Sequence, residues 1–375
     1  MLPLTTRRAA SKASTRYLRH ASSSSVGAPS PSRKVIFSGI QPTGVPHLGN
    51  YLGALQAWVK LQNEAAPDTK LIYSLVDLHA ITVAQSPELL RQHKRQSLAA
   101  LLAIGLDPER SIIFVQSDVP QHSELMWILS CTASMGYLSR MTQWKSKLNL
   151  APNAKPLESP LQLGLFSYPV LQAADILIHG ATHVPVGEDQ CQHLELTRTL
   201  ALGFNERYGP VLTEPETVLS PTKRIMSLVQ PDKKMSKSAT NPKSRILITD
   251  SPDEVTKKIK GALTDSIGGP HTFDPVARPG LANILQLLHS LDHRRIATVE
   301  DLTQEFKDVS MKALKDMLAD AINKHLEPIR TRYLDLTGGT QAGELDRVAE
   351  EGALKARASA EIVMADVRRV VGLSR

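Results

Sequence analysis

Lys70-Leu-Ile-Tyr-Ser-Leu-Val-Asp77 and Ser111-Ile-Ile-Phe-Val-Gln116 are two short apolar runs that a helical pattern separates. The helical pattern begins at Ser86-Pro87-Glu88, where a capping serine, a proline in the first turn and an acidic residue favour a helix start. Further toward the N-terminus, Lys34-Val-Ile-Phe37 predicts an earlier strand, and a helical pattern over about 49–63 follows it. Strands that alternate with helices in this way predict a parallel sheet with helices on both faces.

The rest of the chain continues this pattern and then becomes helical. A short strand at Val184-Pro-Val186 is expected among helices near 122–135, 169–179 and 190–205. After an exposed loop at 221–242, we expect helices from Ser251 and over 280–291, 298–307, 310–335 and 344–371. The sequence therefore predicts an α/β fold, in which a doubly wound parallel-sheet (Rossmann-like) domain over 34–245 precedes an all-helical domain over 246–375.

The positive charge is concentrated at the N-terminus. The chain of 375 residues has 44 basic and 37 acidic residues, and residues 1–34 hold seven of the basic ones and no acidic one. Outside residues 1–34, basic and acidic residues are equal in number, so the net charge gives no support for a basic surface that binds nucleic acid. An Arg-rich, Ser-rich and acid-free segment predicts a transit peptide over 1–33, and a disordered tail that contacts RNA is the alternative.

Cysteine content and hydropathy exclude several classes of protein. Two cysteines, Cys131 and Cys191, form no C-x-x-C pair, and they indicate neither a metal site nor a disulfide scaffold. No apolar stretch approaches the roughly 20 residues that a membrane-spanning helix needs, so we expect no membrane association.

A glycine-rich loop, Ser38-Gly-Ile-Gln-Pro-Thr-Gly-Val-Pro-His-Leu-Gly-Asn50, follows the first predicted strand. A doubly wound fold binds nucleotides at this position, where helix N–H groups favour phosphate. The spacing of Gly44 and Gly49 is that of a P-loop, but Asn50 and Tyr51 replace the required Lys and Ser/Thr, so a P-loop is excluded. A structural turn is the alternative interpretation.

A second candidate segment is Lys233-Lys-Met-Ser-Lys-Ser238. Three lysines and two hydroxyls on a loop are suited to neutralising a polyphosphate as charge builds on a leaving pyrophosphate. A solvated basic loop is the alternative, since most lysine runs are of this kind.

Taken together, the two segments resemble a known family. Pro46-His-Leu-Gly-Asn50 and, about 190 residues later, Lys234-Met-Ser-Lys-Ser238 are similar to the two motifs of class I aminoacyl-tRNA synthetases, written HIGH and KMSKS. The second motif matches fully, whereas the first has Asn50 in place of the final histidine. Asparagine still offers hydrogen-bond donors to ATP.

Three further stretches resemble the tryptophanyl-tRNA synthetases of the bacterial and organellar type: Ser38–Gly44, Tyr168–Asp175 and Val184–Gln190. The tyrosyl branch is the nearest competitor, because it shares the Y-x-x-x-Q-x-x-D spacing. Gly187-Glu-Asp-Gln190 favours the tryptophan branch. Two more distant interpretations are a small nucleotidylyltransferase with an H-x-G-H motif and a non-catalytic RNA-binding descendant of a synthetase.

The resemblance implies roles for individual residues. Asp175 would accept the indole N–H, and the other residues implied to bind tryptophan are Tyr168, Phe37, Gln172, Val184, Val186 and Gln190, with His79, Gln143 and Lys147 as weaker candidates. The residues implied to bind ATP are Gln41, Pro42, Thr43, Gly49, Asn50, Gly187, Glu188, Asp189, Ile225, Lys234, Met235, Ser236, Lys237 and Ser238. The residues implied to act in catalysis are His47, Asn50, Lys234 and Lys237.

The family also implies the partners. We expect tryptophan, ATP with Mg²⁺ and tRNA(Trp) as substrates, no tightly bound cofactor, no metal held by protein ligands, a homodimer, and a location in the mitochondrial matrix. One sequence leaves open the transit-peptide cleavage site, the residues that read the anticodon, and a second role in RNA splicing or in the cytosol.

Overall fold

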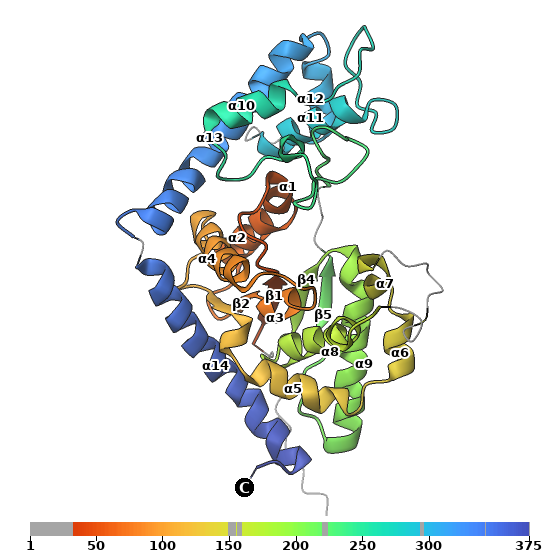
Figure 1. Cartoon of the computed structure of the whole chain (residues 1–375), viewed down its shortest axis with the longest axis vertical. Coiled ribbons are helices and arrows are strands. Elements are labelled where there is room, and N and C mark those ends of the chain that lie inside the picture. Colours follow the sequence, from red (N-terminus) through yellow and green to blue (C-terminus); the bar gives the residue numbers. More distant parts are fainter. Residues whose placement is uncertain are drawn as a thin grey trace, which may run out of the picture. The chain divides into compact units, whose positions relative to one another are not determined.

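The three apolar runs of the N-terminal half are strands in the computed structural model (Figure 1). They are β1 (Val35–Ile40), β2 (Lys70–Leu75) and β3 (Ile112–Val115), and β4 (His183–Val186) and β5 (Glu216–Leu219) complete one sheet. The structure describes residues 33–148, 155, 160–219, 224–292, 296–341 and 343–374. Except for Arg33, the predicted transit peptide therefore lies outside the described residues.

All strands of the sheet are parallel, in the order β3-β2-β1-β4-β5. Since β1 has β2 on one side and β4 on the other, the strand order reverses between β1 and β4. In open parallel sheets, ligands bind outside the carboxyl ends of the strands at this reversal. The glycine-rich stretch from Ser38 begins inside β1, the Val184–Gln190 stretch begins inside β4, and both continue past the carboxyl ends of these strands.

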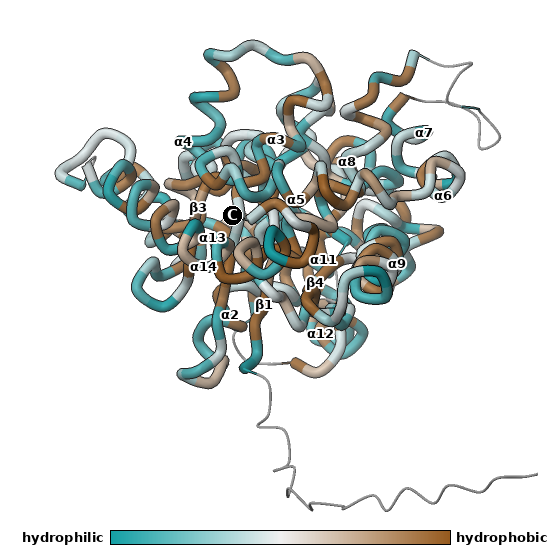
Figure 2. Tube along the Cα trace, turned by 90° about the horizontal axis from the view of Figure 1, so that it is seen from below, coloured by the Kyte–Doolittle hydropathy of each residue, from teal (hydrophilic) through white to brown (hydrophobic). Residues whose placement is uncertain are grey.

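Helices cover both faces of the sheet, which confirms the doubly wound prediction. One core lies under α2 (Gln56–Glu64) and α4 (Pro87–Ala103), and the second lies under α5 (Gln121–Ser130), α8 (Leu163–Leu177) and α9 (Cys191–Tyr208). Figure 2 shows hydrophobic segments gathered at the centre around β1 and β4, with hydrophilic segments outside. Ser86 caps α4 as predicted, because its hydroxyl accepts the backbone N–H of Leu89.

The helical C-terminal part is also confirmed. Its first helices are α10 (Pro252–Lys260), α11 (Pro279–Leu291), α12 (Val299–Glu305) and α13 (Met311–Gly338). The last helix, α14 (Glu344–Val371), leaves this group and packs against β3 and α5 (Figure 1). A side chain at Gly352 would place its Cβ 1.8 Å from the carbonyl oxygen of Ile113, so glycine permits this close approach.

Several local features differ from the sequence prediction, among them the helix expected near 122–135, which ends at Ser130 as α5. The helix expected over 49–63 is α1 (Leu48–Asn50), a π-helical turn η1 (Tyr51–Leu55) and α2 in succession. Helix α8 begins six residues before the expected start and continues through Pro169, with Leu165 and Phe166 of its first turns buried. The strand β5 has two exposed apolar residues and no buried run, so it escaped detection. The short helices α3 (Asp77–Ala80), α6 (Met135–Arg140) and α7 (Gln143–Lys147) are below the length that periodicity detects.

The described residues from Arg33 onward cluster as one compact unit, and the domain boundary at 245/246 stays a prediction. No helix in the described residues is long and apolar enough to cross a membrane.

Candidate functional site

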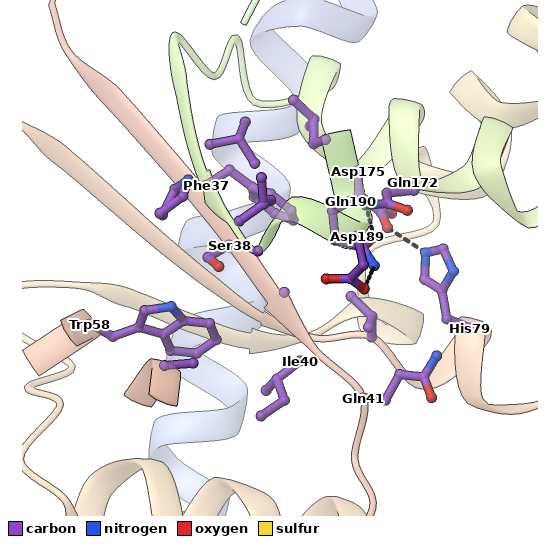
Figure 3. A pocket seen from close by; sticks show the side chains of 18 of the residues that line it. Phe37, Ser38, Ile40, Gln41, Trp58, His79, Gln172, Asp175, Asp189 and Gln190 are labelled. Carbon is purple, nitrogen blue, oxygen red and sulfur yellow. Dashed lines mark hydrogen bonds and ion pairs between the residues drawn. The ribbon is translucent and has the colours of Figure 1, made fainter. Parts of the chain in front are cut away.

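A cavity of about 400 Å³ opens at the reversal of strand order, between the carboxyl ends of β1 and β4 (Figure 3). Its volume is within the range of small-molecule sites. All the residues that the sequence implied for tryptophan line this one cavity: Phe37, Tyr168, Gln172, Asp175, Val184, Val186 and Gln190. The three weaker candidates, His79, Gln143 and Lys147, line it as well.

Asp175 is held by three hydrogen bonds in the cavity wall, and only 1% of its surface is exposed. Its Oδ1 accepts hydrogen bonds from Gln116 Nε2 at 2.6 Å and from His122 Nδ1 at 2.7 Å. Its Oδ2 accepts one from His79 Nε2 at 2.8 Å. A carboxylate offers about four acceptor positions, so one position on Oδ2 remains for a donor in the cavity.

The surroundings keep Asp175 ionised. Burial alone would raise the pKa of Asp175, but hydrogen bonds from His122 and His79 hold it well below its usual range. An ionised carboxylate donates no hydrogen bond and accepts strongly. The cavity therefore presents a fixed acceptor among apolar walls.

Tyr168, Gln172 and Asp175 share one face of α8, which is continuous through all three residues. The Tyr168 hydroxyl donates to Gln143 Oε1 at 2.9 Å, and Gln143 Nε2 donates to the backbone oxygen of Asp189 at 2.7 Å. Gln172 Nε2 donates to Gln190 Oε1 at 3.2 Å. This face of α8 is thereby joined to the Val184–Gln190 segment.

The glycine-rich loop ends in a reciprocal cap on α1. His47 Nδ1 accepts the backbone N–H of Asn50 at 3.1 Å, and Asn50 Oδ1 accepts the backbone N–H of His47 at 3.3 Å. Burial, followed by the charges of Lys237, Arg245 and Lys234, lowers the pKa of His47 to about 4. His47 is therefore neutral at physiological pH, as an acceptor of this hydrogen bond must be.

Folding brings the two motif segments together. Lys237 Nζ donates to the backbone oxygens of Thr43 at 3.0 Å and Gly44 at 2.9 Å, and to Thr43 Oγ1 at 3.0 Å. A smaller cavity of about 140 Å³ lies at this contact and shares Ile40 and Gln41 with the larger one. Burial and then the charge of Arg245 lower the pKa of Lys237 to about 8.

The other residues of the lysine loop differ in exposure. Lys234 and Ser238 are exposed, and Met235 is buried, with its N–H donating to the backbone oxygen of Ile225 at 3.0 Å. The hydroxyls of Ser236 and Ser238 lie 2.8 Å apart.

The residues implied for ATP are only partly brought together. Gln41, Thr43, Asn50 and Lys237 line the smaller cavity, whereas Gly187 and Asp189 line the larger one. Gly49 and Ile225 lie in contact range, since a Cβ at Gly49 would be 3.5 Å from that of Ile225. Pro42 is buried, and in the described structure Glu188 is exposed and outside both linings.

Two residues that hold Asp175 were missed from the sequence. Gln116 ends a predicted strand, so its place at the carboxyl edge of the sheet was a usable signal. His122 lies in an ordinary helical pattern and had no such signal. Within the described ranges, no group of three or more His, Cys, Asp or Glu residues is arranged to hold a metal ion.

Comparisons with known proteins agree with this geometry. The family model described as tRNA synthetases class I (W and Y) matches residues 31–327. The chain is 47% identical to the mitochondrial tryptophan-tRNA ligase of Schizosaccharomyces pombe, over 90% of this chain and 95% of that protein. The chain belongs to the tryptophan-tRNA ligase family.

Solved structures of tryptophanyl-tRNA synthetases have the same fold. The enzyme from Mycoplasma pneumoniae matches with a TM-score of 0.75 and 34% identity, covering 91% of this chain and 98% of that one. The enzyme from Campylobacter jejuni, complexed with ADP and tryptophan, matches with a TM-score of 0.75 and 31% identity, covering 90% of this chain and 100% of that one. The resemblance to the tryptophan branch of class I synthetases is therefore confirmed.

Proposed function

We propose that this synthetase activates tryptophan with ATP and transfers it to tRNA(Trp) in the mitochondrial matrix. The observation that carries the proposal is the buried, ionised Asp175 in the wall of a cavity that Phe37 and Val184 also line. Indole is flat and apolar with a single N–H donor, so apolar walls with one fixed acceptor match it. The mitochondrial relative in fission yeast and the acid-free N-terminus support the location.

In the first step, a carboxylate oxygen of tryptophan attacks the α-phosphorus of ATP. The bond from that phosphorus to the bridging oxygen breaks, and pyrophosphate leaves with its electron pair. Lys237 and Lys234 stabilise the charge that develops on the leaving group, and Gln41, Thr43, Gly49 and Asn50 hold the nucleotide. No protein nucleophile is needed, since positioning and charge stabilisation account for the chemistry.

Residues of the larger cavity are assigned to substrates by their place in it: Gly187 and Asp189 are proposed to contact the adenosine, and Tyr168, Gln172 and Gln190 the amino-acid end of tryptophan. Glu188 and Ile225 are proposed to contact the adenosine on the family resemblance. Mg²⁺ enters with the phosphates of ATP as part of the substrate. In the second step, the 2′-hydroxyl of the terminal adenosine of tRNA attacks the acyl carbon, and AMP leaves.

We propose a homodimer that forms through α5, α6 and the start of α8. Trp127, Met135 and Leu163 on these helices are exposed to 70%, 65% and 75%. Exposed large apolar residues on adjoining elements mark interaction surfaces. Replacing Trp127 and Leu163 by aspartate is expected to yield monomers in analytical ultracentrifugation, and an unchanged dimer would place the interface elsewhere.

ATP–pyrophosphate exchange tests the activity, with the chain lacking residues 1–32 and each amino acid in turn. Exchange with tryptophan alone is the expected result. Exchange with tyrosine would overturn the assignment of Asp175 and of Val184–Gln190. No exchange by folded protein that binds ATP would favour a nucleotidylyltransferase or an RNA-binding protein.

A further inference from the structure

Behind Asp175, buried polar side chains continue from the cavity wall to the last helix. His122, which donates to Asp175, lies edge to face with His179 at a centroid distance of 5.2 Å. His179 Nδ1 lies 3.0 Å from the Ser359 hydroxyl on α14, and Lys70 Nζ lies 2.5 Å from the same hydroxyl. His122, His179 and Ser359 are all at least nine-tenths buried.

The two ends of this polar chain set the direction of its hydrogen bonds. Lysine only donates, so the Ser359 oxygen accepts from Lys70. Among the described contacts of the Ser359 hydroxyl, His179 Nδ1 is the group that can accept its hydrogen, so Ser359 donates to His179. At the other end, ionised Asp175 only accepts, so the proton of His122 is on Nδ1. Burial lowers the pKa of His179 well below its ordinary value, so the His179 ring is neutral.

This assignment leaves complementary groups on the two neighbouring rings. A neutral His179 that accepts at Nδ1 carries its proton on Nε2, and the Nε2 of His122 is an acceptor when that ring carries only its Nδ1 proton. Both Nε2 atoms are buried, and neither has a hydrogen-bond partner among the described residues. An unpaired buried polar group is costly, so the edge-to-face contact of the two rings is the place where these Nε2 atoms can satisfy each other.

Helix α14 supplies Ser359 and also holds the helix that carries His122. Arg368 pairs with Glu124 of α5 at 2.6 Å, and Gln121 of α5 donates to Glu361 at 3.1 Å. The close approach at Gly352 fixes the same helix against β3. The positions of Ser359 and His122 are therefore set together by the docking of α14.

We propose that His122, His179 and Ser359 are positioning residues for the tryptophan site, which hold the Asp175 carboxylate in place and make tryptophan binding depend on the docking of α14. The inference rests on the proposed role of Asp175 as acceptor of the indole N–H. It adds that this role depends on α14, a helix that lines neither cavity in the described structure.

Ring packing is the alternative explanation, since His179 stacks on Phe37 at 5.8 Å and meets Phe114 at 5.6 Å. The substitution His179→Phe distinguishes ring packing from hydrogen bonding, because it keeps an aromatic ring and removes both nitrogens. Ser359→Ala removes the hydroxyl at the α14 end of the polar chain. Ser359→Thr retains the hydroxyl and is the rescue variant.

The test measures ATP–pyrophosphate exchange with the full chain. For Ser359→Ala and His179→Phe, we expect the KM for tryptophan to rise about three- to tenfold, with kcat and the KM for ATP nearly unchanged, as for the loss of one hydrogen bond. Ser359→Thr is expected to remain near the parent. Ala360→Gly is the matched control, because it weakens α14 at the next buried position and leaves the polar chain intact.

A double variant tests whether the two residues act through one link. Ser359→Ala combined with His179→Phe is expected to have no larger effect than the stronger single variant. In ¹⁵N-histidine spectra, His122 is expected as the Nδ1–H form and His179 as the Nε2–H form, with the His179 form lost in Ser359→Ala. Additive effects, or opposite ring forms, would overturn the inference.

Asp175→Asn distinguishes failure of the inference from failure of the proposed function. If Asp175→Asn raises the KM for tryptophan while Ser359→Ala and His179→Phe leave it unchanged, only the inference is wrong. An equal rise in Ala360→Gly would also refute it, since packing alone would then be the cause. If Asp175→Asn leaves that KM unchanged, the proposed acceptor role fails, and the inference fails with it.

Discussion

The tryptophan end and the phosphate end of the site are built in different ways. At the tryptophan end, Asp175 is almost fully buried and holds three hydrogen bonds before any substrate arrives. At the phosphate end, Lys234 is exposed, and Lys237 reaches only the oxygens of a loop. The first end is fixed by folding, whereas the second consists of long side chains on a loop.

This difference matches what each end has to do. Selection among amino acids needs an acceptor that does not move, because a wrong ligand must leave it unpaired. Stabilisation of a leaving pyrophosphate needs charge that follows the phosphates, and a lysine on a loop provides it. We therefore expect substitutions at the first end to change tryptophan selection and those at the second to change turnover.

Replacement of Asp175 is expected to have the largest effect. Asp175→Ala removes the indole acceptor and leaves donors of Gln116, His122 and His79 unpaired, so kcat/KM for tryptophan should fall about 10²- to 10⁴-fold in exchange assays. Asp366→Ala is the control, because it removes a carboxylate from an exposed pair with Arg369. An unchanged kcat/KM for tryptophan would remove Asp175 from the site.

Replacement of Lys237 should affect the phosphate end of the site. Lys237→Ala is expected to lower kcat about 100-fold and to change the KM for tryptophan far less, because the charge acts in the transition state. Lys233→Ala is the matched control, since Lys233 is an exposed lysine of the same loop. The reverse pattern, a raised KM with normal kcat, would contradict the proposed role.

The pH dependence of ATP use tests whether the charge of Lys237 acts at the phosphate end of the site. Burial disfavours the charged form and lowers the pKa of Lys237 to about 8, so the free enzyme has this charge below that pH and loses it above. We expect kcat/KM for ATP to fall above about pH 8, by up to about tenfold per pH unit. In Lys237→Arg this decline should move to higher pH, and an unmoved decline would assign it to another group.

Replacement of Asn50 is expected to have the smallest effect. Asn50→Ala removes half of the reciprocal cap with His47 and should cost about 1 kcal/mol of unfolding free energy, together with a few-fold rise in the KM for ATP. Ser86→Ala removes the cap of α4 at similar cost and is the control for stability alone. Equal KM values for ATP in both variants would make Asn50 purely structural.

Local patterns predicted those elements whose cause is local. The strands β1 to β3 and the capped starts of α4 and α10 followed from apolar runs and from serine and proline at the right positions. The early start of α8 could not be predicted, because it depends on burial of Leu165 against distant segments. The strand β5 is defined by pairing with β4, which no periodicity within β5 records.

The sequence alone determined the family, the two motif segments and the choice of Asp175, because these depend on residue types at fixed spacing along the chain. Only the tertiary structure decided that Lys237 reaches Thr43 and that His122, His179 and Ser359 extend from Asp175 to α14. Hydrogen bonds form over a few ångströms in space, whereas Ser359 and Asp175 are separated by more than 180 residues along the chain. The strand order and the docking of α14 bring them together.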